Sequence, residues 1–167
     1  MNIFEGFTRK EVIDLAGTTS NRLQYLERAN LITPLRVEKT GRATVLYTWE
    51  QLLEIRAIKN LRQSISLQTV RKIIEFLDKS GFDDSLRDKQ LICVDEEIYW
   101  VERNWEGMPE ILKVAAKRGK GVGQYTLLVI PALIDIVDEV WEAAEKSNVV
   151  DMASFQQRAK ARRSKVA

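Results

Sequence analysis

Residues 18–34 of the chain read TTSNRLQYLERANLITP, the pattern of a short helix with a hydroxyl-rich start and a proline stop. Leu23 and Leu26 lie three residues apart, so a helix over 21–29 would bury both on one face. Pro34 cannot continue a helix, because its ring fixes φ and its nitrogen carries no hydrogen. The stretch therefore predicts a short amphipathic helix whose polar side chains face the solvent.

A second helix is predicted directly upstream. Thr8-Arg9-Lys10-Glu11 has the form of a capping box, so a helix should begin at Arg9, and Gly17 should end it. Two short helices joined by a glycine turn are typical of a helix-turn-helix, although any antiparallel helix pair gives the same pattern.

A β-wing is predicted downstream of Pro34. Residues 35–37 and 43–47 are short strand-forming runs around a charged turn that contains Gly41. Such a ribbon sharpens the prediction from a simple helix pair to a winged helix-turn-helix.

Two longer helices should follow the wing. Thr48 and Gln51 form a second capping box, which opens a helix that reaches about Arg62. Ser66 caps a further helix that reaches about Lys79. Apolar residues recur at helical spacing in both segments.

The second half of the chain mixes strands and helices. The pattern predicts a hairpin over 90–94 and 98–103, a helix from Pro109 to about residue 117, a strand over 124–130 and a helix from Pro131. The predicted fold class is therefore α+β.

Three domains with unequal charge are predicted. Residues 1–80, the winged helix-turn-helix, hold 13 basic and 9 acidic side chains. Residues 81–147, an α+β module for dimerisation or effector binding, hold 8 basic and 14 acidic side chains. Residues 148–167, a basic mobile tail, hold 5 basic and 1 acidic. The asymmetry favours contact between a polyanion and parts of the chain, while uneven surface charge without a partner gives the same counts.

Composition excludes several kinds of chemistry. The 167 residues include no histidine and one cysteine, Cys93, which excludes histidine-dependent nucleophilic catalysis, nearly every zinc site and an internal disulfide. We therefore predict no enzyme activity, no catalytic residue, no metal and no cofactor. The longest apolar run, 125–134, is too short to span a bilayer. We expect a cytoplasmic protein without membrane contact.

The residues from Arg22 to Pro34 resemble the second helix and its exit in MerR-type transcription regulators. That family has an arginine, an aromatic residue, an acidic residue and then Gly-Leu-Ile-x-Pro. Asn30 replaces the glycine here, and asparagine also tolerates the left-handed conformation that the turn requires.

The resemblance extends over residues 4–79. Arg42 and Tyr47 match the wing, and 65–70 matches the start of the fourth helix. The family's long C-terminal dimerisation helix and its metal-sensing cysteines are missing. Compact MerR-type repressors of mobile-element or CRISPR-associated transposon operons look similar in architecture.

The resemblance implies that the helix over 21–29 enters the DNA major groove and that the wing follows the backbone. The side chains suit these roles, because Arg pairs with guanine, Asn and Gln pair with adenine, and hydroxyls at a helix start hold phosphate. The predicted DNA-binding residues are Thr18, Thr19, Ser20, Asn21, Arg22, Gln24, Tyr25, Arg36, Lys39, Arg42, Thr44, Tyr47, Lys59 and Arg62.

The predicted function is sequence-specific binding of double-stranded DNA by a homodimeric repressor on an inverted repeat, since family members bind as dimers. The predicted dimer interface comprises Tyr125, Leu127, Val129, Val137 and Trp141. A small-molecule effector stays open but is not favoured, because the module's aromatic residues are needed for its own core. Two alternatives also stay open: an antitoxin-like protein-interaction module that regulates its own operon, and an architectural excisionase-like DNA binder.

Overall fold

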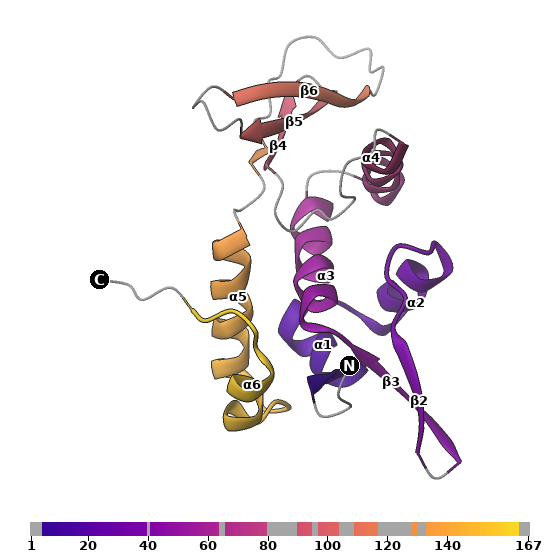
Figure 1. Cartoon of the computed structure of the whole chain (residues 1–167), viewed down its shortest axis with the longest axis vertical. Coiled ribbons are helices and arrows are strands. Elements are labelled where there is room, and N and C mark those ends of the chain that lie inside the picture. Colours follow the sequence, from indigo (N-terminus) through magenta and orange to yellow (C-terminus); the bar gives the residue numbers. More distant parts are fainter. Residues whose placement is uncertain are drawn as a thin grey trace. The chain divides into compact units, whose positions relative to one another are not determined.

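The computed structural model describes residues 5–39, 41–63, 66–79, 90–94, 97–103, 109–116, 128–129 and 133–163 (Figure 1). The chain forms two compact units. The first unit combines Met1–Lys59 with Ile134–Ala167, and the second unit is Asn60–Leu133, inserted between those two segments. This division differs from the predicted domain boundaries, because the C-terminal residues pack with the N-terminal ones.

The first unit contains both halves of the helix-turn-helix. Its elements in chain order are β1 (Phe7–Thr8), α1 (Arg9–Ala16), α2 (Ser20–Arg28), β2 (Leu35–Lys39), β3 (Arg42–Tyr47), α3 (Trp49–Arg62), α5 (Leu133–Lys146) and α6 (Met152–Arg158). The last three residues of α3 and the first residue of α5 are assigned to the second unit.

Turn and cap residues set the bounds of α1 and α2 as predicted. Thr8 Oγ1 accepts a hydrogen bond from the Glu11 backbone nitrogen, and Glu11 Oε1 accepts one from the Thr8 nitrogen, which completes the capping box. Gly17 ends α1 with a φ of 65°. Asn30, beyond the end of α2, has a φ of 56°, so it takes the left-handed conformation usual for glycine.

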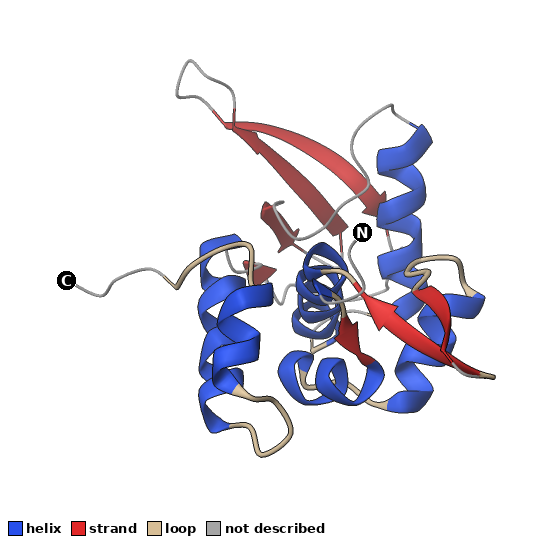
Figure 2. Cartoon of the chain, turned by 60° about the horizontal axis from the view of Figure 1, so that its bottom comes forward, coloured by secondary structure: helices blue, strands red, loops and turns tan. Residues whose placement is uncertain are grey.

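The wing is an antiparallel hairpin in a three-stranded sheet. The strand order is β1-β3-β2, and Gly41, with a φ of 78°, lies in the turn between β2 and β3. Figures 1 and 2 both show this hairpin projecting beyond the helices of the first unit. Thr48 and Gln51 then form the second predicted capping box, which opens α3.

An aromatic cluster forms the centre of the first unit's core. Phe155 of α6 is completely buried, and its ring centroid lies 6.2 Å from that of Phe7 and 6.0 Å from that of Trp49. Trp141 of α5 meets Phe155 edge-on at 4.9 Å. The cluster thus joins the start of the chain to its end.

A mobile tail is predicted over 148–167, but the structure has a helix there, α6, which packs in the first unit. Asp151 caps α6 by accepting a hydrogen bond from the Ser154 nitrogen at 2.9 Å. The sequence of this stretch contains only one large aromatic residue, Phe155, and its burial depends on partners that are distant in the chain. Local polarity therefore did not reveal the helix.

The second unit combines a helix with an antiparallel sheet. Its elements are α4 (Leu67–Lys79), β4 (Gln90–Val94), β5 (Glu97–Arg103), β6 (Pro109–Ala116) and β7 (Leu128–Val129), with the sheet order β6-β5-β4-β7. Ser66 caps α4 as predicted, since its Oγ accepts a hydrogen bond from the Thr69 nitrogen. The predicted hairpin is confirmed, with Cys93 opposite Ile98.

The predicted helix from Pro109 is wrong, because these residues form the edge strand β6. Proline suits the first residue of an edge strand as well as the first turn of a helix. Ile111 pairs with Val101 of β5, and this long-range pairing decides between the two structures. Of the strand predicted over 124–130, residues 128–129 form β7 and the others lie outside the described residues. No helix in the described part of the chain is long and apolar enough to cross a membrane.

Candidate nucleic-acid interface

α2 presents a polar face to the solvent because its leucines face inward. Leu23 and Leu26 are at most 1% exposed. Residues three and four apart in a helix share a face, so the polar residues between and beside the leucines line up on the outside. The exposed or partly exposed residues of this face include four predicted DNA contacts: Asn21, Arg22, Gln24 and Tyr25.

Three hydroxyl groups gather at the start of α2, on Thr18, Thr19 and Ser20. Thr19 is the N-cap, and its Oγ1 accepts a hydrogen bond from the Arg22 nitrogen at 3.2 Å. Thr18 is half-buried and Ser20 is exposed. The first-turn N–H groups of a helix carry partial positive charge, so this end of α2 can accept a phosphate oxygen.

The strand register separates the wing's predicted contacts onto two faces. Thr44 lies opposite Val37, and Arg42 opposite Lys39. Residues directly opposite in an antiparallel pair share a face, so Lys39, Arg42 and Thr44 belong to one face of the hairpin. Arg42 and Thr44 are exposed, whereas the Lys39 side chain lies outside the described residues.

Arg36 lies on the other face of the wing, where it contacts α2. Its Nη2 lies 2.5 Å from Glu27 Oε1, while 55% of its side chain stays exposed. The pair links β2 of the wing to α2. Arg36 therefore has a partner on α2 while part of its side chain stays at the surface.

Tyr47 is buried, which corrects its assignment as a DNA contact. It shares a face with Arg36 and is only 1% exposed. Its hydroxyl has no hydrogen-bond partner among the described residues. Burial raises the pKa of this hydroxyl, while the nearby Arg9 cation opposes the rise. The residue therefore packs beneath the interface.

The sequence predicts that Lys59 contacts DNA, but its side chain faces the end of α1. A Cβ atom built on Gly17 would lie 2.6 Å from Lys59 Nζ, so the ammonium group is packed against this glycine. Arg56 Nη1 lies 3.4 Å from the Ala16 carbonyl oxygen. Burial lowers the pKa of Lys59, and the neighbouring Arg56 cation lowers it further. Arg62 belongs to the second unit, and its buried Nε has no partner among the described residues.

Arg9 is a basic residue near the interface that sequence reasoning missed. Its Nη2 donates to the Ser20 carbonyl oxygen at 3.4 Å, which places its guanidinium beside the start of α2. The sequence pattern marks Arg9 only as the first residue of a helix. Its approach to α2 depends on the fold of the helix pair, and no local signal carries it.

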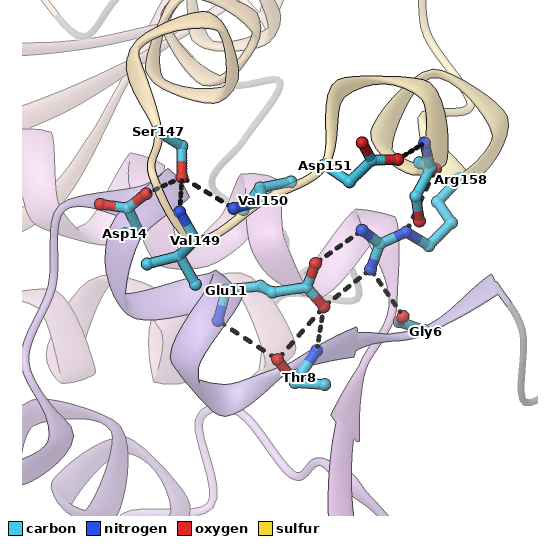
Figure 3. Close-up of polar contacts among 10 residues, drawn as sticks. Gly6, Thr8, Glu11, Asp14, Ser147, Val149, Val150, Asp151 and Arg158 are labelled. Carbon is cyan, nitrogen blue, oxygen red and sulfur yellow. Dashed lines mark hydrogen bonds and ion pairs between the residues drawn. The ribbon is translucent and has the colours of Figure 1, made fainter.

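Three basic residues near the C-terminus, Arg158, Lys160 and Arg163, are paired with acids of the first unit. Arg158 binds Glu11 through both Nη1 and Nη2, at 2.8 and 2.6 Å (Figure 3). Lys160 Nζ lies 3.4 Å from a Glu50 oxygen. Arg163 Nη1 donates hydrogen bonds to both carboxylate oxygens of Glu145, at 2.8 and 2.9 Å. Each of these three cations therefore has a carboxylate partner, and the Lys160 and Arg163 pairs lie at the surface.

The Arg158–Glu11 pair is also the most enclosed of these contacts. The side chains are 8% and 14% exposed, and Arg158 Cζ lies 4.5 Å from the Phe7 ring centroid. Burial acts to raise the pKa of Glu11, but hydrogen bonds from Arg158 and Thr8 hold it below its ordinary value. Glu11 is therefore ionised and serves both the capping box and the ion pair.

Two predicted dimer contacts, Val137 and Trp141, take part in packing within the first unit. Val137 is 4% exposed, and Trp141 packs on Phe155 while its Nε1 donates to the Ala161 carbonyl oxygen at 2.9 Å. Intrachain packing therefore uses both side chains. Val129 lies in β7, and Tyr125 and Leu127 lie outside the described residues.

Comparison with known families agrees with this geometry. Residues 7–81 match the family model described as MerR HTH family regulatory protein. No curated protein matches the chain. The matched region includes α1, α2, the wing and α3, which are the elements that carry the polar face and the exposed wing residues. Residues 7–81 are therefore similar to the MerR HTH family of regulatory proteins, and this similarity supports a role in DNA-binding transcription regulation.

Proposed function

We propose that the protein is a sequence-specific regulator that reads double-stranded DNA with α2 and grips the backbone with the wing. The observation that carries this proposal is the row of Asn21, Arg22 and Gln24 on the outer face of α2. These side-chain types match the hydrogen-bonding edges of adenine and guanine in the major groove. The buried leucines leave that face free of any packing role.

Phosphate contacts would flank this reading helix on both sides. The hydroxyl-rich start of α2 offers one anion site, and Arg42 and Thr44 on the wing offer another. Such contacts position a protein on the duplex without reading its sequence. We replace Tyr47 and Lys59 in this scheme by Arg9, whose guanidinium lies beside the start of α2.

We further propose that the protein represses transcription as a homodimer on an inverted repeat. One recognition helix contacts few base pairs, and a two-fold dimer doubles the contacts at a spacing of one helical turn. The dimer interface would lie on the second unit, including Val129, because Val137 and Trp141 are used in intrachain packing. An architectural role would instead need no preferred DNA sequence, and an antitoxin-like role would need a bound protein partner.

Selection of duplexes from a random DNA library with the purified protein tests this function. We expect enrichment of an inverted repeat. The variant Arg22→Ala should then bind the selected duplex about 1–3 kcal/mol more weakly and accept other bases at one position of each half-site. A folded protein that enriches no sequence would contradict the proposed regulator and favour the protein-interaction alternative.

A further inference from the structure

The C-terminal segment, residues 134–163, contacts the first helix of the helix-turn-helix directly at two points and indirectly, through α3, at a third. Arg158 binds Glu11 in the first turn of α1, and Ser147 Oγ donates to Asp14 in the next turn (Figure 3). The third contact reaches the end of α1 through Arg56 of α3. A segment far downstream in the sequence thus supports the helix that precedes α2.

The third contact reaches the turn that leads into the recognition helix. Arg56 Nε donates to Glu139 Oε2 of α5 at 2.7 Å, and Arg56 Nη1 points to the Ala16 carbonyl oxygen. Lys59 is packed against Gly17, the next residue, which is held in the left-handed conformation. Two cations of α3 therefore enclose the end of α1.

This cationic pair needs an acid nearby. The carbonyl groups at the end of α1 carry partial negative charge and attract Arg56 and Lys59, but the two cations repel each other. Glu139 is bonded directly to Arg56, and its charge also acts on Lys59. Only 18% of the Arg56 side chain is exposed, so the guanidinium depends on its protein partners.

We propose that Glu139 is a positioning residue for DNA recognition, which holds Arg56 on the end of α1 and so sets the turn that directs α2. Glu139 touches no DNA in this scheme. The inference rests on the function proposed above. Hydrogen bonds to base edges weaken steeply with small changes of distance and angle, so loss of this support should reduce sequence reading before it reduces backbone binding.

The matched variants Glu139→Ala and Glu142→Ala test the proposal in the full chain. Both remove one negative charge from α5, so general attraction to DNA changes equally. Glu142 bonds to Lys146 of its own helix at 2.6 Å. The measurement is the ratio of affinities for the selected duplex and for a scrambled duplex of the same composition.

We expect Glu139→Ala to lower this specificity ratio about threefold to tenfold, while Glu142→Ala leaves it unchanged. Partial unfolding would reduce both affinities by the same factor and leave the ratio intact. If Glu139→Ala does not fold, Glu139→Gln provides the same test, because it removes the charge and keeps a side-chain oxygen. We expect Glu139→Gln to lower the specificity ratio less than Glu139→Ala does.

The outcomes separate this inference from the proposed function. If both variants keep the specificity ratio of the original protein, the positioning role of Glu139 is overturned and the proposed function stands. If the original protein binds the scrambled duplex as tightly as the selected one, the proposed function itself is overturned.

Discussion

The wing and the end of the C-terminal segment are both rich in basic residues, yet their surroundings differ. Arg42 is exposed on the wing. In the C-terminal segment, Arg158, Lys160 and Arg163 are each bound to a carboxylate of the first unit. Similar composition thus gives an exposed Arg42 beside a paired Arg36 in the wing, and three carboxylate-paired cations in the C-terminal segment.

The difference teaches that charge along a sequence does not by itself locate a DNA-binding surface. The acids that neutralise the C-terminal cations come from three different helices, namely Glu11 of α1, Glu50 of α3 and Glu145 of α5. Their effect depends on packing, which brings distant parts of the chain together. Substitutions at Arg158, Glu11, Arg42 and Arg163 can break or sharpen this contrast.

The largest expected effect is on the Arg158–Glu11 pair. Arg158→Met keeps an apolar stem over Phe7 but leaves the Glu11 carboxylate enclosed without its cation. We expect the free energy of unfolding to fall by about 3 kcal/mol at neutral pH, measured by urea denaturation. Arg42→Met on the wing should change it by less than about 0.5 kcal/mol.

A double variant refines this test. Glu11→Gln combined with Arg158→Met removes both charges, and glutamine can still complete a capping box with Thr8. We expect the double variant to regain part of the lost stability. A double variant less stable than Arg158→Met alone would contradict the account of an uncompensated carboxylate.

A smaller effect is expected from acid. The pKa of Glu11 is 4.5 in its ordinary state and lower in the folded protein. Its ionised form therefore stabilises the fold above pH 4.5, and this contribution is lost as the pH falls through the lower, folded pKa. The stability of the original protein should fall more steeply below pH 4.5 than that of the double variant, as thermal melts across this range would show. If the stability of the two proteins falls equally with pH, Glu11 does not account for the acid sensitivity.

The smallest expected effects are on the salt dependence of DNA binding. Arg42→Ala should reduce the slope of log affinity against log salt concentration by about one, because one phosphate contact is lost. Arg163→Ala should leave the slope unchanged, since its guanidinium already binds Glu145. Equal reductions in the two variants would mean that the C-terminal cations also contact DNA.

The sequence could predict the interface where its signals are local. The two capping boxes, Gly17 and Asn30 are read from neighbouring residues, because a cap or a left-handed turn depends on a few adjacent groups. The exposed face of α2 follows from the spacing of Leu23 and Leu26 alone. These features account for the prediction of the recognition helix.

Other features of the site could not be read in this way. The sequence does not distinguish Arg36 from Arg42, although only the first binds α2, because their separation onto two faces depends on strand register. The family pattern predicts that Tyr47 contacts DNA, whereas its burial follows from its position in the packed sheet. Arg9 reaches the start of α2 only through the fold of the helix pair.

By itself, the sequence determined the winged helix-turn-helix, its caps and the similarity of residues 7–81 to the MerR family. Tertiary structure alone decided that Pro109–Ala116 is a strand and that α6 is packed in the first unit. The physical reason is the range of the interactions. Caps, turns and helical spacing act within about one or two helical turns, whereas an edge-strand pairing, the burial of Phe155 and the Arg158–Glu11 pair gain their free energy only when distant segments meet.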